Sequence, residues 1–357
     1  MKIAVDARPL SYPLTGIGRY THSLLQQLTK SEHDWYLYSD RPLLSELPEA
    51  QNVNIRVGNA QGGTPGSLRW AQWQYVKWAR SDGIDVFWSP RHHLPLILPK
   101  KTRSVVTIHD LVWRRYPETM QRKNFWLEKL LMGPSIRKAN KLIAVSQFTA
   151  SEISTFYPDA QAKTTVIYEA ANETNANATL ARELPDDFFL FVGTLEPRKN
   201  LERLLESCAQ VLEPNMPLVI AGAQGWGEVQ LQKLLVRFDL ANRVICLGYI
   251  NDEMLDTLYA NANALIMPSV YEGFGLPVVE ALKYGVPCIV SKGTSLEEVA
   301  GEAAILVNPY SVSEISKAIT NIQKPEVHSS LAKHAIDRSL AFSWAKAANQ
   351  TLSVLTD

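Results

Sequence analysis

The sequence predicts an α/β protein built from two Rossmann-like, doubly wound domains, each with a parallel sheet. Short apolar runs alternate with helical patterns, and this alternation occurs twice along the chain. At 357 residues the chain is also longer than one domain of about 100–200 residues. The apolar runs are nearly continuous in Val, Ile, Leu and Phe, which is typical of parallel strands buried on both faces. We expect the two domains to face each other across a cleft, with ligands beyond the carboxyl ends of the strands.

The predicted strands are bounded by helical or turn-forming segments. They are 2–6, 35–39, 53–57, 86–89, 104–109, 141–145 and 165–168 in the first half, and 188–193, 217–221, 243–247, 264–267, 287–290 and 304–307 in the second. Helical patterns include 20–28, 200–211 and 311–322. Between the two sets, apolar periodicity lapses and Asn, Thr and Ala dominate. The predicted organisation is therefore a first domain over 1–170, a linker over 171–184 and a second domain over 185–340.

Composition excludes several classes of protein. The hydrophobic fraction of 46% and charged fraction of 20% are those of a globular protein, not a disordered or fibrous one. Cys208, Cys246 and Cys288 are too few and too scattered for a disulfide scaffold or a zinc cluster, and we interpret them as reduced core residues of a cytoplasmic protein. No apolar run reaches the roughly 18 residues of a membrane span, and residues 1–6 are typical of a strand rather than a signal peptide.

The formal net charge is zero, with 36 basic and 36 acidic side chains, which argues against a nucleic-acid partner held by overall charge. The charges are unevenly distributed. Residues 1–170 carry 22 basic and 14 acidic side chains, and the rest of the chain carries 14 and 22. This asymmetry suggests two domains with different partners, although chance scatter of surface charge would also produce it.

Three loops that follow predicted strands carry candidate chemistry. In the first, Gly16 and Gly18 precede a helix and would let backbone N–H groups approach a phosphate or a hydroxyl. Position 21 is Thr21 instead of the third glycine of the dinucleotide fingerprint, and no suitable acidic residue ends the second strand. A hydride-transferring dehydrogenase is therefore poorly supported, and a tight turn without a ligand fits this loop equally well.

The second loop, 193–200, places Arg198 and Lys199 at the mouth of the sheet, with Asn200 as a helix cap. Two adjacent cations there suit a diphosphate, because the charge of a departing phosphate must be neutralised. A solvated basic turn is the alternative.

The third loop spans 271–280. Gly273 and Gly275 free the backbone for close approach to a ligand, and Pro277 suits a first helical turn. Glu280 is expected on the first turn of that helix, near the ligand that Glu272 would meet. Two carboxylates around a glycine loop suit recognition of a polyol.

At this point the motifs resemble a family. EGFGLPVVE, a pair of glutamates with seven residues between them, resembles the retaining glycosyltransferases of family 4, which have the GT-B fold. GTLEPRKN is similar to the diphosphate loop of that family, and VDARPL, GIGRY and VVTIHDLVW resemble its N-terminal domain. The resemblance covers nearly the whole chain and is strongest to bacterial mannosyltransferases of O-antigen assembly. It also implies that the helix in 341–357 crosses back to the first domain.

The resemblance implies roles for individual residues. Arg198 and Lys199 would hold the diphosphate, and Glu280 the ribose hydroxyls. Glu272 and the backbone groups of the next four residues would hold the sugar hydroxyls and the phosphate; these residues are Gly273, Phe274, Gly275 and Leu276. From the other domain, Gly16 in the loop that includes Gly18 would approach the diphosphate, and His109 would contact the sugar near its anomeric centre.

Two further assignments stay less specific. Asp110 would either orient His109 or meet the acceptor, and the nucleotide base would lie near residues 222–224 and 248–250. The sequence contains no Asp-x-Asp triplet, so we expect no metal and no cofactor: cations and a helix N-terminus would stabilise the leaving group. The implied mechanism is retaining, with the leaving phosphate accepting the proton of the acceptor.

The predicted function is transfer of mannose from GDP-mannose to a polyprenyl-diphosphate-linked glycan in O-antigen synthesis, by a cytoplasmic enzyme peripheral to the inner membrane. Two alternatives remain open: a GT-B sugar-nucleotide epimerase, and a non-catalytic nucleotide- or carbohydrate-binding protein. Two basic segments rich in aromatic residues, 67–80 and 113–141, favour contact with an anionic membrane surface. The alternative for each is a helix packed on the sheet with a solvated basic face.

Overall fold

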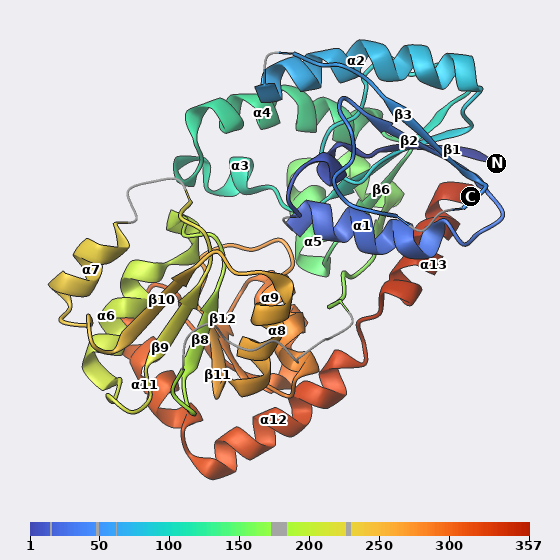
Figure 1. The fold of residues 1–357 in the computed structure, drawn as a ribbon. Helices are drawn as coiled ribbons and strands as arrows, with labels where there is room; N and C mark the ends of the chain where they lie inside the picture. The colour runs from blue at the N-terminus through green and yellow to red at the C-terminus, as the bar shows by residue number, and fades with distance from the viewer. Residues whose placement is uncertain (15, 48–49, 62, 173–183, 226–229) are drawn as a thin grey trace. The chain divides into compact units, whose positions relative to one another are not determined.

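The computed structural model describes residues 1–14, 16–47, 50–61, 63–172, 184–225 and 230–357 (Figure 1). The chain divides into two compact units. Unit 1 comprises residues 1–115, 122–169 and 343–357, and unit 2 comprises 116–121 and 170–342. Of the predicted linker over 171–184, only residues 171, 172 and 184 lie within the described residues. None of the helices in the described ranges has the length and apolar character needed to cross a membrane.

Unit 1 is built on a parallel sheet with the strand order β3-β2-β1-β4-β5-β6-β7. Its strands are β1 (Lys2–Asp6), β2 (Asp34–Ser39), β3 (Val53–Val57), β4 (Val86–Ser89), β5 (Arg103–Ile108), β6 (Lys141–Ala144) and β7 (Thr164–Val166). Its α-helices are α1 (Gly16–Leu28), α2 (Gly63–Asp82), α3 (Val112–Arg115), α4 (Arg122–Lys138), α5 (Gln147–Phe156) and α13 (Trp344–Thr356). Helix α13 packs beside α1 (Figure 1), where the rings of Trp344 and Tyr20 meet edge to face with centroids 6.1 Å apart.

Unit 2 has a parallel sheet with the order β10-β9-β8-β11-β12-β13. Its strands are β8 (Phe189–Val192), β9 (Leu218–Ala221), β10 (Val244–Gly248), β11 (Ala264–Met267), β12 (Cys288–Ser291) and β13 (Ala304–Val307). Its α-helices are α6 (Leu201–Val211), α7 (Leu231–Arg237), α8 (Asp252–Asn261), α9 (Leu276–Lys283), α10 (Ser295–Ala300), α11 (Val312–Ile322) and α12 (Pro325–Ser339). The apolar face of α6 is buried against the sheet, because Leu201, Leu204, Leu205 and Cys208 recur at helical spacing in the core.

The predicted fold class is confirmed: both sheets are parallel and every predicted strand is present. Differences are confined to the ends. The first helix begins at Gly16 rather than Tyr20, and β5 ends at Ile108, one residue before His109. The three cysteines are free; Cys208 and Cys288 are buried, whereas Cys246 is only half-buried. In each unit the strand order reverses beside the first strand, between β1 and β4 and between β8 and β11. Ligands of doubly wound sheets bind at such switch points.

Candidate functional site

Two loops meet at the switch point of unit 2. Strands β8 and β11 are neighbours, and each is followed by one of the predicted motifs. Arg198 and Lys199 lie on a short 3₁₀ turn, η4 (Pro197–Lys199), that follows β8, and Glu272 follows β11. The backbone N–H of Val270 donates to the carbonyl of Arg198 at 2.9 Å and joins the two loops. The fold thus brings Glu272 to two predicted site residues, Arg198 and Lys199, that precede it by more than 70 positions in the sequence.

Glu272 forms ion pairs with both cations. Its Oε1 accepts from Lys199 Nζ at 2.6 Å, and its Oε2 accepts from Arg198 Nη1 at 2.6 Å. Arg198 also donates through Nε to Glu196 at 3.0 Å. Glu272 and Lys199 are each 6% exposed, whereas the Arg198 side chain is 23% exposed. Of the two cations, Arg198 is therefore the one that a ligand can reach from solvent.

Burial and neighbouring charges together set the pKa values of Glu272 and Lys199. Burial alone would raise the pKa of Glu272, but Arg198 and Lys199 outweigh it and lower that pKa to about 2. Burial also lowers the pKa of Lys199, although the charge of Glu272 opposes this. Because both oxygens of Glu272 bind cations, its first effect is to hold the two cations in place. A carboxylate has further lone pairs with which to accept hydroxyl groups.

The lowered pKa of Glu272 predicts a loss of stability in acid. A carboxyl with a pKa of about 2 when folded, against an ordinary value near 4.5, contributes stability that is present above pH ~4.5 and lost as the pH falls through ~2. We expect roughly 3 kcal/mol of unfolding free energy from this group across that window. The measurement is urea unfolding at pH 6 and pH 3 of the wild type and of Glu272→Gln. If the variant lost as much stability as the wild type on acidification, the assignment would be wrong.

The glycine loop leads into α9, which begins at Leu276 with Pro277 in its first turn, as predicted. Glu280, however, is the fifth residue of α9 and lies in its second turn, so its predicted first-turn position is wrong. With Gly275 as the N-cap, Glu280 would lie in the first turn only if the helix began at least one residue later. Glu280 Oε2 accepts from the hydroxyl of Tyr259 at 2.8 Å. The side chain of Phe274 is buried and packs edge to face on Phe342.

Adding a single methyl group at Gly275 is expected to destabilise the protein. The φ of Gly275 is 112°, and a Cβ there would lie 2.4 Å from Cδ2 of the buried Leu296. Gly275→Ala is expected to lower the free energy of unfolding by about 1–3 kcal/mol, because left-handed strain and a clash add together. Gly293→Ala is the matched control, since Gly293 also has a positive φ of 72° but open space around its Cβ position. Equal losses for the two variants in urea unfolding would contradict the clash.

Asn200 differs from its predicted role as a helix cap made by its side chain. It occupies the N-cap position of α6, but its φ is 61° and its side chain accepts no capping bond from the helix. Instead its amide donates to the carbonyls of Pro268 at 2.9 Å and Pro309 at 2.6 Å. This buried amide therefore fastens the loops after β11 and β13 to η4. The sequence predicted a side-chain cap because Asn is favoured directly before a helix. Nothing in the neighbouring sequence indicates the distant carbonyls that its amide bonds.

The two loops predicted to meet the base lie beside this cluster at the same edge of the sheet. Gly222 follows β9 and donates to the carbonyl of Gly248 at 2.8 Å, while Leu195 donates to Ala223 at 3.0 Å. A Cβ on Gly222 would lie 2.0 Å from the carbonyl oxygen of Gly193. The loops after β8, β9 and β10 therefore pack backbone to backbone, which only glycine permits at Gly222.

In unit 1, each ring nitrogen of His109 lies within hydrogen-bond distance of a partner. The ring Nδ1 lies 3.0 Å from Glu169 Oε1, and Nε2 lies 2.8 Å from the carbonyl oxygen of Pro90. A carbonyl only accepts, so Nε2 donates to Pro90, and Nδ1 faces the carboxylate of Glu169. Asp110 does not bond this ring in the described part of unit 1: its Oδ1 accepts from the N–H of Val112. Glu169, and not Asp110, therefore orients His109.

Sequence reasoning missed a second histidine cluster beside this one. His92 and His93 follow β4, and His92 Nε2 accepts the backbone N–H of His109 at 3.2 Å. His93 Nε2 donates to Glu128 Oε2 of α4 at 2.9 Å, and burial lowers the pKa of His93. The sequence Arg91-His92-His93 directly after a buried strand is a signal that could have found these histidines. Nothing local marks Glu128 or Glu169 as their partners.

The two glycines of the first predicted loop differ in their surroundings. A Cβ on Gly16 would have open space, whereas one on Gly18 would lie 3.2 Å from the carbonyl of Pro9 and 3.1 Å from Leu14. Packing therefore explains Gly18, and only Gly16 leaves room beside the start of α1 for another group. At the end of β1, Asp6 forms a buried pair with Arg8, with Nε donating at 2.8 Å.

Comparison with known proteins agrees with these motifs. Residues 14–174 match the family model "Glycosyltransferase Family 4", and residues 173–338 match "Glycosyl transferases group 1". The chain is 30% identical to O-antigen chain mannosyltransferase B of Escherichia coli, over 99% of both chains. Among solved structures, sucrose-phosphate synthase from Thermosynechococcus elongatus superposes with a TM-score of 0.82 at 20% identity, covering 99% of this chain and 98% of that one. Anabaena HepE in complex with UDP-glucose has a TM-score of 0.75 at 20% identity, covering 100% and 99%.

The full-length relative and the two family models agree with the architecture of two parallel sheets. The chain belongs to the family 4 glycosyltransferases and has the GT-B fold.

Proposed function

We propose that this glycosyltransferase transfers mannose from GDP-mannose to a lipid-linked glycan with retention of the anomeric configuration. The observation that supports it is the placement of Arg198 and Lys199 at the switch point of unit 2, both fixed by Glu272. Two preorganised cations there would stabilise the charge that grows on a departing diphosphate. The leaving phosphate would accept the proton of the acceptor hydroxyl. Mannose is favoured because the full-length relative is an O-antigen mannosyltransferase.

The other donor contacts are proposed on the same site. Glu280 would bind the ribose, and the backbone of residues 273–276 would bind the sugar hydroxyls and the phosphate. His109, held by Glu169 in unit 1, would contact the transferred sugar. The experiment is a thermal-shift series with GDP-, UDP- and ADP-sugars at saturation. GDP-mannose is expected to stabilise the chain by a few kcal/mol, and Lys199→Met to lose that shift. A shift with UDP-sugars alone would overturn the choice of donor.

We propose further that transfer needs no metal and no other cofactor. Arg198 and Lys199 would supply the positive charge that a metal ion supplies in a metal-dependent transferase, and the sequence has no Asp-x-Asp triplet. Turnover is expected to persist in excess EDTA. Loss of turnover in EDTA with recovery on adding Mg²⁺ would contradict this proposal.

The lipid-linked acceptor implies contact with a membrane surface, and α4 offers a face for it. Trp126 and Leu130, four residues apart on this helix, are 54% and 64% exposed. Arg122, Lys123 and Lys129 surround them in exposed positions, and Lys129 Nζ lies 4.8 Å from the centroid of the Trp126 ring. An apolar pair within a basic ring suits an anionic bilayer. In the other predicted segment, 67–80, Tyr75 is buried and Trp78 packs on Tyr38. Trp73 is 70% exposed there, but it has no second exposed large apolar side chain beside it in that segment, all of which the structure describes.

The membrane proposal is tested by sedimentation with lipid vesicles. Binding is expected to vesicles that contain phosphatidylglycerol, to weaken with salt and to be lost in a Trp126→Ala/Leu130→Ala double variant. Leu44→Ala, at a side chain of unit 1 that is 66% exposed, is the matched control. Equal binding to neutral and anionic vesicles would contradict an electrostatic contact.

A further inference from the structure

We propose that a pocket on α2 is a carbohydrate-binding subsite that holds a sugar residue of the glycan acceptor away from its reacting end. The pocket has a volume of about 370 Å³ and is lined by Asn59, Gln61, Gly66, Arg69, Trp70, Trp73 and Gln74. None of these residues belongs to the clusters described above. The identity of the glycan rests on the proposed function, whereas the presence of a sugar site does not.

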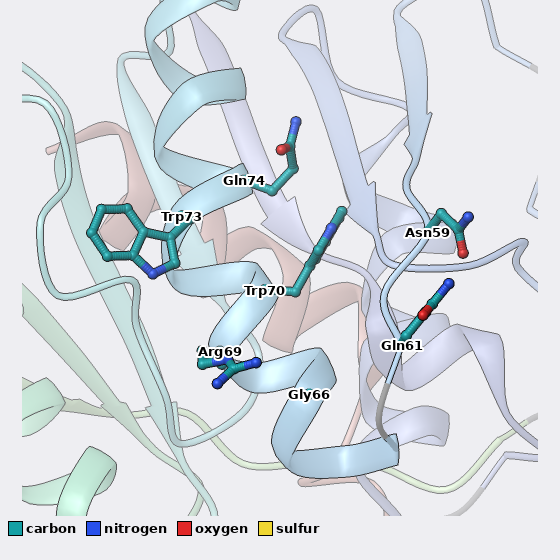
Figure 2. A pocket seen from close by; sticks show the side chains of 7 residues that line it. All are labelled: Asn59, Gln61, Gly66, Arg69, Trp70, Trp73 and Gln74. Carbon is teal, nitrogen blue, oxygen red and sulfur yellow. The ribbon is translucent and has the colours of Figure 1, made fainter.

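One face of α2 forms most of the pocket. Its five helical lining residues recur at positions i, i+3, i+4, i+7 and i+8 from Gly66, which places them on one stripe of the helix. Leu68, Ala71, Tyr75 and Ala79 lie on a different face and are buried in the core. Apart from Trp70, which is partly buried, the side chains on the pocket face of α2 are therefore not part of the core. Figure 2 shows Trp70 between α2 and the segment that carries Asn59 and Gln61, with Trp73 projecting from the helix.

The ring of Trp70 is fixed by close packing. A Cβ on Gly58 would lie 2.0 Å from Cζ2 of Trp70, so the ring occupies the space that any other residue at 58 would fill. The ring also meets Trp78 edge to face at 5.4 Å and Tyr75 at 5.7 Å between centroids. At Gly66, a Cβ would lie 1.8 Å from the carbonyl oxygen of Gln61. The two glycines thus let α2 and the segment after β3 close around a preformed pocket.

The exposed groups have the chemistry that a sugar ring requires. The side chain of Trp73 is 70% exposed, an uncommon state for so large an apolar surface. Within the described ranges, the polar side chains of Asn59, Gln61, Arg69 and Gln74 make no hydrogen bond or ion pair. A pyranose has an apolar C–H face that can stack on an indole and a rim of hydroxyls that amides and a guanidinium can bind. One arginine among three amides suits a neutral ring better than a phosphate or an anionic bilayer.

The pocket lies away from His109, where the transferred sugar is proposed to bind. Its loop follows β3 and its helix begins there, so it lies at the carboxyl edge of the sheet, as His109 does after β5. The segment with Asn59 follows β3, whereas Ser67 of α2 accepts from Arg8 just past β1. The order β3-β2-β1-β4-β5 therefore puts between two and four strand spacings between the pocket and His109, or about 10–19 Å at ~4.8 Å each. A sugar at this pocket would lie at least two sugar residues from the acceptor hydroxyl. Long acceptors would reach it and short ones would not.

Binding of a soluble mannohexaose to the full chain, measured by calorimetry without any donor, tests the subsite. The wild type is expected to bind the hexaose, and Trp73→Ala and Arg69→Ala to raise its Kd about tenfold. Trp73→Phe is expected to restore most of the affinity, because a ring remains for stacking. Leu44→Ala, which removes an equally exposed apolar side chain elsewhere on unit 1, is expected to bind as the wild type does. No binding by the wild type, or unchanged binding by Trp73→Ala, would overturn the inference.

Transfer assays separate this inference from the proposed function. With a lipid-linked acceptor of six sugars, Trp73→Ala is expected to raise KM several-fold at unchanged kcat, while a two-sugar acceptor shows no change. Hexaose binding without any transfer would refute the proposed function and leave the subsite standing. If Trp73→Ala left transfer unchanged with both the six-sugar and the two-sugar acceptor, the subsite alone would be refuted. Loss of vesicle binding in Trp73→Ala with hexaose binding intact would show a membrane contact instead, and would also overturn it.

Discussion

Glu272→Gln is expected to cost both activity and stability. The carboxylate is 6% exposed and bonds Lys199 and Arg198 at 2.6 Å each. An amide keeps the shape but leaves the buried Lys199 ammonium without its counter-charge, which destabilises a protein by about 3–5 kcal/mol. The cations also lose the group that fixes them, so kcat is expected to fall about 10²–10³-fold. Urea unfolding and steady-state turnover measure the two effects.

A matched control for this variant exists on the surface of the same unit. Glu202 bonds Arg237 at 2.7 Å, but the two side chains are 58% and 63% exposed. Glu202→Gln is expected to change the free energy of unfolding by less than about 1 kcal/mol and to leave turnover unchanged. If Glu272→Gln behaved like Glu202→Gln, the buried cluster would have neither of the roles assigned to it.

Arg198→Ala is expected to separate catalysis from stability. This side chain is 23% exposed, and its loss leaves the buried Glu272–Lys199 pair intact. Arg198 also lowers the pKa of Glu272, so stability is expected to fall by about 1–2 kcal/mol, less than in Glu272→Gln because Lys199 still neutralises the carboxylate. The cation nonetheless matters when negative charge builds on the departing diphosphate, so kcat is expected to fall about 10²–10³-fold with a much smaller change in KM.

Arg198→Lys tests whether geometry or charge matters more. The guanidinium uses Nε for Glu196 and Nη1 for Glu272, a fork that an ammonium cannot reproduce. We expect only part of the lost turnover to return. A rise in KM at constant kcat for Arg198→Ala would show that the residue binds the ground state and would contradict a role in the transition state.

The fold was predictable because the central strands of both sheets are short, buried, apolar runs between helices, whereas the edge strands β3, β7, β10 and β13 are partly exposed. The boundary of β3 and that of β11 agree with the structure to the residue, since each run ends at turn-forming residues. The contents of the loops after β8 and β11 were also predictable, because Arg198, Lys199 and Glu272 follow strands at the carboxyl edge of a doubly wound sheet.

What could not be predicted depends on contacts between distant residues. The pairing of His109 with Glu169 joins positions 60 residues apart, and that of His93 with Glu128 joins positions 35 apart. Asn200 lay in the predicted cap position, yet its amide bonds Pro268 and Pro309. The pocket on α2 depends on Gly58 meeting the ring of Trp70, which requires the packing of a helix on the segment before it.

The most direct test of the central claim is a transfer assay with GDP-mannose and a polyprenyl-diphosphate-linked glycan, with the product linkage determined by NMR. Wild-type enzyme is expected to form a mannosylated lipid-linked product with the anomeric configuration of the donor, and Arg198→Ala to form it at least about 100-fold more slowly. An inverted linkage would contradict the retaining mechanism. Conversion of the sugar nucleotide without any acceptor, or equal rates for wild type and variant, would contradict glycosyl transfer at the Arg198–Lys199–Glu272 site.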